Sequence, residues 1–197
     1  GYYFADLIFK NRGLNNAPDS ETFRKWQKPS FLSLNFQISL PLASYPIGPS
    51  SRFKVSSGCM SVLEGAHFFS PYIGLGGRFS VTRTSVIVDN IRAENNVFDT
   101  CRIGGGAYFS CPLSTRWLAG SKLLVERVHY PDLQQTSYLV DSRHSFSLGT
   151  GLSLTFRAHQ HYGIRLLLDY DLLPYRTAGR QICVHSLTLG TAFLVAF

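Results

Sequence analysis

The sequence predicts an all-β protein, an eight-stranded antiparallel transmembrane β-barrel over residues 30–197 that follows a short N-terminal extension, residues 1–29. Three observations predict this fold class. Apolar and polar residues alternate along most of the chain, which is the period of a β-strand whose two faces meet different environments. The alternating segments reach the roughly 9–11 residues that cross a bilayer, whereas globular strands average about 5–6. Long and short connections also alternate along the chain, as in barrels that place their short turns on one side of a membrane.

The composition is compatible with a barrel and excludes several other classes. Of 197 residues, 14% are aromatic and only 16% are charged, below the roughly 25% charged residues of typical soluble domains. A disordered chain would be rich in charge and poor in aromatics, and a helical bundle would be rich in Ala, Glu, Lys and Leu. No apolar run approaches the roughly 18 residues of a membrane helix, but such a search does not detect alternating strands. No signal peptide is recognisable, so we expect a mature or trimmed chain.

The first predicted strand, 30–41, shows the alternation most clearly. From residue 32 to residue 40 one parity is entirely apolar and the other is entirely polar, a pattern that a helix does not produce. The apolar parity consists of Leu32, Leu34, Phe36, Ile38 and Leu40. Four less regular strands follow, predicted at about 51–63, 67–83, 98–112 and 116–130.

The last three predicted strands alternate as cleanly as the first, and they lie at about 144–157, 161–175 and 186–197. In the final strand, Leu187, Leu189 and Phe193 share one parity, with small or polar residues between them. An even number of strands with both termini on the short-turn side closes into a barrel. The links between the eight strands are predicted at 42–50, 64–66, 84–97, 112–115, 131–142, 158–160 and 176–181.

A soluble lipocalin-like carrier, with the apolar parity turned inward, is the rival interpretation. Eight strands enclose only enough space for their own side chains or one small ligand, so the many Leu, Phe, Ile and Tyr residues would overfill it. The opposite parity is mostly Ser, Gly and Thr, whereas a water-facing surface carries about 25–35% charged residues. We therefore expect the apolar parity to face lipid, with Leu32, Phe36, Leu148, Leu166 and Leu189 in contact with it.

Within the central portions of the predicted strands the apolar parity carries no charge, as lipid contact requires, and the charges there fall on the inward parity. Opposite charges that converge in a barrel can pair and hydrogen-bond, which offsets their loss of hydration. We expect an ion-pair network that stiffens the outer half of the barrel rather than an ion pathway, and inward glycines that make room for side chains such as Tyr108. The predicted network comprises Arg52, Lys54, Arg78, Arg102, Glu126, Asp169 and Asp171, and the parity also places Lys122, Arg157 and Arg165 inward.

Two segments carry a resemblance to a known class of proteins. The alternating segment Ser186–Phe197 ends the chain on Phe, with Phe193 four residues earlier, and looks like the terminal strand that marks substrates of the outer-membrane assembly machinery. The segment Pro71–Ser80, PYIGLGGRFS, is similar to a recurring strand of outer-membrane barrels, including Bacteroidota ones. Together with the eight strands and their links, residues 30–197 resemble small bacterial outer-membrane barrels of the OmpA/OmpX type.

The resemblance implies a location and leaves the function open. It implies the outer membrane of a Gram-negative bacterium, both termini in the periplasm, and outer-membrane lipid and lipopolysaccharide around the barrel. This fold hosts adhesion, scaffolding, lipid enzymes and narrow pores, so the architecture does not specify the activity.

No catalytic, cofactor or metal site is predicted. In the Ser/His pairs 144–145 and 185–186, adjacent residues point to opposite faces of a strand and do not converge as nucleophile and base. The four cysteines lack the spacing of a zinc site, and all fall on the apolar parity, where we expect buried thiols. The net charge of +7 is spread singly, without the basic stripe of a nucleic-acid-binding protein, so no nucleic-acid partner is predicted.

The first 29 residues differ in character from the barrel. An apolar and aromatic stretch at 2–9 precedes a polar link and a short predicted helix that ends before Pro29. An apolar stretch outside the barrel usually marks an interaction surface. We expect this extension to dock a protein partner or to plug the periplasmic mouth, using Tyr2, Tyr3, Phe4, Phe23 and Trp26.

These inferences favour a non-enzymatic integral barrel that acts as an anchor or scaffold subunit of an outer-membrane protein assembly. Three alternatives stay open at this point: a lipid A-modifying enzyme, a narrow pore and, least favoured, a soluble lipocalin-like carrier. The first interpretation is preferred because no convergent catalytic set is recognisable.

Overall fold

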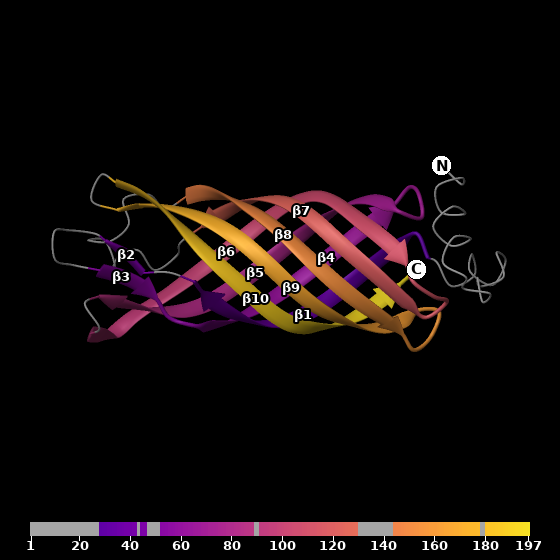
Figure 1. Ribbon diagram of the computed structural model, residues 1–197, viewed down its shortest axis with the longest axis horizontal. Coiled ribbons are helices and arrows are strands. Elements are labelled where there is room, and N and C mark those ends of the chain that lie inside the picture. The colour runs from indigo at the N-terminus through magenta and orange to yellow at the C-terminus, as the bar shows by residue number, and fades with distance from the viewer. Residues whose placement is uncertain (1–27, 43, 47–51, 89–90, 130–143, 178–179) are drawn as a thin grey trace.

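The computed structural model describes residues 28–42, 44–46, 52–88, 91–129, 144–177 and 180–197. Eight long strands wind around one axis into a closed barrel, and two short strands, β2 (Ser44–Pro46) and β3 (Arg52–Val55), add a hairpin at one end (Figure 1). No helix long and apolar enough to span a membrane occurs in this part of the chain. The eight barrel strands are β1 (Ser30–Pro41), β4 (Gly58–Phe68), β5 (Ile73–Val88), β6 (Ile91–Pro112), β7 (Trp117–His129), β8 (His144–Arg157), β9 (Tyr162–Thr177) and β10 (Arg180–Ala196).

Every barrel strand pairs antiparallel with a neighbour on each side, which confirms the predicted fold class. β1 pairs with β4 and β10, so the first and last strands close the ring, and the others follow in chain order. The backbones of Ser30 and Phe197 exchange two hydrogen bonds of 3.0 Å where the chain enters and leaves the barrel. A closed ring pairs the backbone of each strand, which is the condition for β-structure in hydrocarbon. We call the end that holds Ser30 and Phe197 the terminal end, and the other the opposite end.

The first short turn of the barrel is not where the sequence predicts it. The sequence suggests a turn at 64–66, but β4 continues through Phe68 and the turn lies at 69–72. Gly65 indicates a turn in the sequence, yet its role is a close strand contact, because a Cβ there would lie 3.1 Å from the Phe31 carbonyl oxygen. The shift moves residue 64 from a turn into the wall of the barrel.

The links predicted at the opposite end are also largely strand. At 84–97, β5 and β6 remain paired until Val88 lies opposite Ile91; 176–181 is likewise mostly strand, and 42–50 contains β2. Polar and Asn-rich segments indicate loops, but antiparallel pairing uses backbone groups alone. Strands that continue beyond the apolar band therefore carry polar side chains without losing their partners.

The apolar parity forms the outer wall of the barrel. The five residues predicted to face lipid, Leu32, Phe36, Leu148, Leu166 and Leu189, are all between 47% and 62% exposed. Polar residues of the other parity are buried in the lumen instead. An apolar wall of this extent is what a transmembrane barrel presents to lipid. The lipocalin-like alternative requires the reverse arrangement and is therefore wrong.

Candidate functional site

Eight charged side chains from five strands, β4, β5, β6, β7 and β9, converge inside the barrel. The parity of each strand turns them inward, and none is more than 7% exposed. Four cations face four carboxylates, so the set is electrically balanced. The cations are Arg78, Arg102, Lys122 and Arg165, and the carboxylates are Glu64, Glu126, Asp169 and Asp171.

Arg78 on β5 lies at the centre of this lumen network. Its Nε and Nη2 donate to both carboxylate oxygens of Glu126 on β7, at 2.8 and 2.5 Å. Nη2 also donates to Asp171 at 2.8 Å, and Nη1 donates to Asp169 at 3.2 Å, both on β9. One guanidinium thus joins strands on opposite sides of the barrel, and three carboxylates depend on it.

The network continues from this centre toward both ends. Arg102 Nη1 on β6 lies 2.9 Å from Asp171. On the other side, Lys122 Nζ on β7 lies 3.0 Å from Asp169 and 2.5 Å from Glu64, and Glu64 also accepts from Arg165. Each charge meets at least one opposite charge, which is the condition under which buried ions are tolerated. The lumen is filled by side chains at this level.

The structure brings together five of the seven residues of the predicted network: Arg78, Arg102, Glu126, Asp169 and Asp171. Arg52 and Lys54 lie elsewhere, because they are exposed side chains of β3. β3 and β4 both pair with β5, but residues 56–57 separate them and shift the register by one residue, so the parity of β4 does not extend back into β3. This part of the prediction is wrong.

Three members of the network are absent from the predicted set. Lys122 and Arg165 have the inward parity, but the sequence does not show what they contact. Glu64 falls in the misplaced turn, although it shares its parity with the buried Met60 and Val62. That shared parity is the signal that identifies it.

Glycines opposite the network provide the space that it occupies. A Cβ on Gly149 would lie 2.7 Å from Asp171 Oδ1, and one on Gly151 would overlap Asp169 Oδ1 and lie 2.7 Å from Lys122 Cε. Nearer the terminal end, a Cβ on Gly76 would lie 2.7 Å from the Tyr108 ring. The structure therefore gives these inward glycines the role that the sequence predicts.

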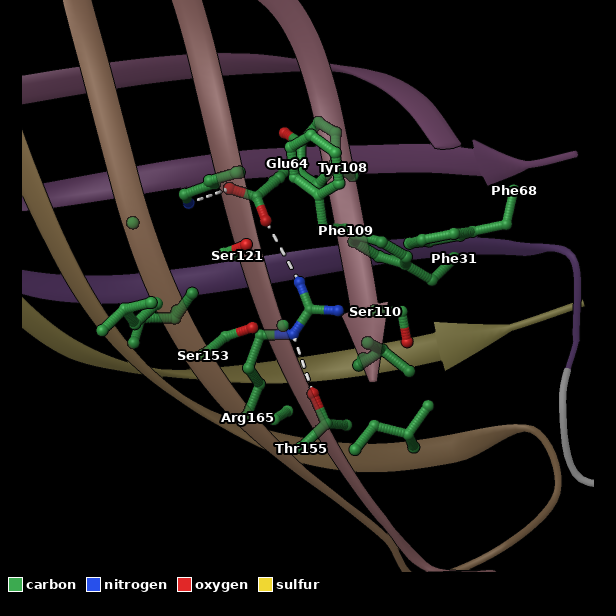
Figure 2. Close-up of a pocket in the computed structure, with 18 of the residues that line it drawn as sticks. Phe31, Glu64, Phe68, Tyr108, Phe109, Ser110, Ser121, Ser153, Thr155 and Arg165 are labelled. Atoms are coloured by element: carbon green, nitrogen blue, oxygen red, sulfur yellow. Dashed lines mark hydrogen bonds and ion pairs between the residues drawn. The ribbon is translucent and has the colours of Figure 1, made fainter. Parts of the chain in front are cut away.

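Between the network and the terminal end lies a small pocket, with a volume of about 50 Å³. Figure 2 shows Arg165 in its centre, with the guanidinium between Glu64 and Thr155. Arg165 Nη1 donates to Glu64 Oε1 and Nε donates to Thr155 Oγ1, both at 3.1 Å. Its Cζ lies 4.1 Å from the centre of the Phe31 ring, which in turn packs edge-on against Tyr108 with ring centres 6.0 Å apart.

The pocket also holds cationic side chains that lie outside the network. Arg157 at the end of β8 is 7% exposed, and its Nε has no hydrogen-bond partner among the residues that the structure describes. Lys28 is half-buried at the entrance to β1. Within the described part of the chain, no carboxylate lies within ion-pair distance of either residue.

The Ser/His pairs do not form a nucleophile–base arrangement. Tyr170 and His185 are hydrogen-bonded on the outside of the barrel, whereas Ser186 is buried and bonds the Ser39 hydroxyl at 2.7 Å. The exposed His144 stacks on the His129 ring. Adjacent residues of a strand point to opposite faces, as the sequence predicts for these pairs.

No group of three or more potential metal ligands occurs among the described residues. The expectation of buried thiols is wrong for Cys59, Cys111 and Cys183, which are exposed on the outer wall. The reason is that the apolar parity is the outer face of the barrel. The predicted docking residues Tyr2, Tyr3, Phe4, Phe23 and Trp26 and the link 131–142 lie outside the described residues.

Comparison with known proteins adds information about the fold. No family model matches the sequence, and no curated protein matches it. The structure is similar to the outer membrane protein OprG from Pseudomonas aeruginosa, with a TM-score of 0.62 and 11% identity over 87% of this chain and 98% of that chain. It is also similar to Neisserial surface protein A, with a TM-score of 0.55 and 14% identity over 86% and 97% of the two chains. The outer membrane protein AlkL has a TM-score of 0.56 and 14% identity over 87% and 90%. At these identities the likeness shows the fold alone, which is that of the small outer-membrane β-barrels the sequence resembles.

Proposed function

We propose that this protein is an integral outer-membrane barrel that acts as a closed, non-enzymatic anchor for a protein assembly. The observation that carries the proposal is the filled lumen. The eight charges of the lumen network are buried against one another, and the pocket beside them measures about 50 Å³. Opening a path for ions requires separating buried pairs, at a cost of about 3–5 kcal/mol for each partner left without its counter-charge. The filled lumen therefore supports an anchor over a narrow pore.

The lengths of the connections support an orientation. The turns at the terminal end are short and lie at 69–72, 113–116 and 158–161. At the opposite end the strands continue as hairpins beyond the apolar band. Outer-membrane barrels place short turns in the periplasm and longer connections outside the cell. We infer that the terminal end faces the periplasm and that the opposite end emerges among lipopolysaccharide.

The N-terminal extension is the element that best suits a partner. A barrel with a filled lumen binds through its loops, its outer wall or its extension. Residues 1–28 contain the apolar and aromatic stretch 2–9, which is not part of the barrel sequence pattern. Apolar stretches of this kind mark interaction surfaces. The extension is therefore proposed as the segment that holds the partner.

The experiment compares three forms of the protein in native membranes: the full chain, a form without residues 1–28, and a form with 131–142 replaced by a Gly/Ser linker of equal length. All three are cross-linked and purified in detergent. We expect the full chain and the linker variant to retain the same partner, and the truncated form to migrate as a folded, heat-modifiable barrel without it. A truncated form that keeps the partner contradicts the role of the extension.

A second measurement addresses enzymatic activity. Lipid A from cells with and without the protein is compared by mass spectrometry. The proposal predicts identical acyl-chain and phosphate patterns. A mass difference that depends on the protein contradicts the non-enzymatic assignment and favours a lipid A-modifying enzyme.

A further inference from the structure

We propose that the pocket at the terminal end is a binding site for a phosphate group, which Arg157 contacts directly and Lys28 helps to neutralise. The basis is a mismatch of charge inside the barrel. The four cations of the lumen network each lie within 3.2 Å of a carboxylate oxygen. Arg157 is equally buried, and none of the carboxylates in the described ranges lies within ion-pair distance of it.

A buried guanidinium without a counter-charge is costly, because it has lost water and gained no partner. The pocket does not supply an anion to it. Glu64 is the acidic residue that lines the pocket, and its two oxygens are already bound by Lys122 and Arg165. An anion that enters the pocket from outside therefore supplies the counter-charge that the described residues do not give Arg157.

The pocket fits a phosphate group in both charge and size. Arg157 and Lys28 contribute two positive charges that the described residues leave unpaired, and a phosphate monoester carries about −1.5 to −2 at pH 7. About 10–15 Å³ holds one water, so 50 Å³ accepts a small polyatomic anion. Hydroxyl groups of Ser110, Ser153 and Thr155 line the same space. Since Thr155 Oγ1 accepts a bond from Arg165, its own proton is free to donate to an anion.

Two sources present this chemistry at the mouth of a barrel: free inorganic phosphate and the headgroup of an anionic phospholipid. Either places a phosphoryl group against a fork of guanidinium donors, which is the geometry that arginine favours. Both present phosphoryl oxygens to the same donors, although the phosphodiester of a phospholipid carries a single negative charge, so the experiment separates the sources.

The first arm uses the full chain, folded in a nonionic detergent in phosphate-free buffer, and titrates inorganic phosphate by calorimetry. The variants are Arg157→Gln and the matched control Arg116→Gln, which removes an equal charge from an exposed residue at the same end, outside the pocket. We expect saturable binding to the unmodified chain, at least tenfold weaker binding to Arg157→Gln, and an affinity within twofold for Arg116→Gln. Equal affinities of the two variants would overturn the proposal.

A second readout covers the case in which a variant folds poorly. The measured quantity is the transition temperature, at which half of the protein loses the gel mobility of the folded barrel. Without phosphate, Arg157→Gln removes an unpaired buried charge, so its transition temperature should equal or exceed that of the unmodified chain. Adding phosphate should raise the transition of the unmodified chain, by mass action on the folded state, and leave that of Arg157→Gln unchanged. A lower transition temperature of Arg157→Gln in phosphate-free buffer would show that the guanidinium is already satisfied and would refute the proposal.

The lipid arm repeats the phosphate titration in nanodiscs of phosphatidylcholine alone and of phosphatidylcholine with phosphatidylglycerol. Competition by phosphatidylglycerol assigns the site to a lipid headgroup, and binding that phosphatidylglycerol does not change assigns it to free phosphate. If neither inorganic phosphate nor phosphatidylglycerol shifts the transition of the unmodified chain, the pocket is not a phosphate site.

Discussion

Replacing Arg78 with methionine tests whether the lumen network holds the barrel together. The substitution keeps a long apolar stem and removes the guanidinium that contacts Glu126, Asp169 and Asp171. Asp169 retains Lys122 at 3.0 Å, so the three carboxylates are not affected equally. The loss of stability depends on which carboxylate is left without a counter-charge.

Glu126 is the carboxylate that loses the most hydrogen bonds and its closest counter-charge. Asp171 keeps Arg102 at 2.9 Å, whereas Glu126 keeps the same arginine only at 3.8 Å and loses both hydrogen bonds to Arg78. Removing one partner of a buried pair costs about 3–5 kcal/mol, and we expect Arg78→Met to lower the free energy of unfolding by that amount. Adding Glu126→Gln removes the stranded charge, so the double variant should be at least as stable as Arg78→Met, with a coupling energy of about 1–3 kcal/mol.

The assay is urea unfolding in lipid vesicles, followed by the heat-modifiable fraction on gels. Arg83→Met is the matched control, because the Arg83 side chain is 73% exposed and its ion pair with Asp99 measures 3.7 Å. Such exposed pairs contribute about 0–1 kcal/mol. If Arg78→Met lowers the free energy of unfolding no more than Arg83→Met, or if the effects of Arg78→Met and Glu126→Gln are simply additive, the lumen network does not hold the barrel together.

Two further substitutions test the inside and the outside of the wall. Gly151→Ala places a methyl group against the lumen network and should lower the free energy of unfolding by about 1–3 kcal/mol. The control Gly77→Ala lies on the exposed face and should change the free energy of unfolding by about 0.5 kcal/mol or less. Equal effects of the two substitutions in the same urea assay would show that the network adjusts freely. Phe36→Arg places a charge in the middle of the apolar band and should cost about 2–4 kcal/mol, against about 0–1 kcal/mol for Leu42→Arg beyond the end of β1. A Phe36→Arg barrel that inserts into vesicles as stably as the Leu42→Arg barrel would mean that this face does not meet lipid.

The alternation of the sequence is sufficient to predict which face of each regular strand meets lipid. In β1, Phe36 is exposed and its neighbour Asn35 is fully buried, as period-2 alternation requires. The same parity places Arg78 and Asp169 inside the barrel, although they lie 91 residues apart. Parity is a local property of a strand, so one sequence reveals it.

The partners across the lumen are not a local property. Arg78 on β5 meets Asp169 and Asp171 on β9 because of the stagger between strands that closes the barrel, and this stagger is fixed by the whole ring. Nothing in the residues around Arg78 specifies it. The charge and the face of these residues are therefore predictable, whereas their pairing required the structure.

The alternation does not predict the buried face correctly where a strand is interrupted. Val55 is buried and Lys54 exposed, but beyond 56–57 the buried positions are the even-numbered ones, beginning with Met60. The break reverses the alternation, so extending one register across it places Arg52 and Lys54 on the wrong face. A one-residue slip exchanges the two faces of a strand, so the alternation of β4 predicts the wrong face for these two residues.

Conductance through the barrel tests the central claim, that the lumen is closed by its own side chains. The full chain, folded in detergent and shown to be heat-modifiable, is added to a planar lipid bilayer under an applied voltage, with an open porin and the boiled protein as controls. We expect insertion without discrete conductance steps, because the charged side chains around Arg78 are buried against one another. Reproducible steps from the folded chain, absent with the boiled sample, would contradict it and would favour the narrow pore.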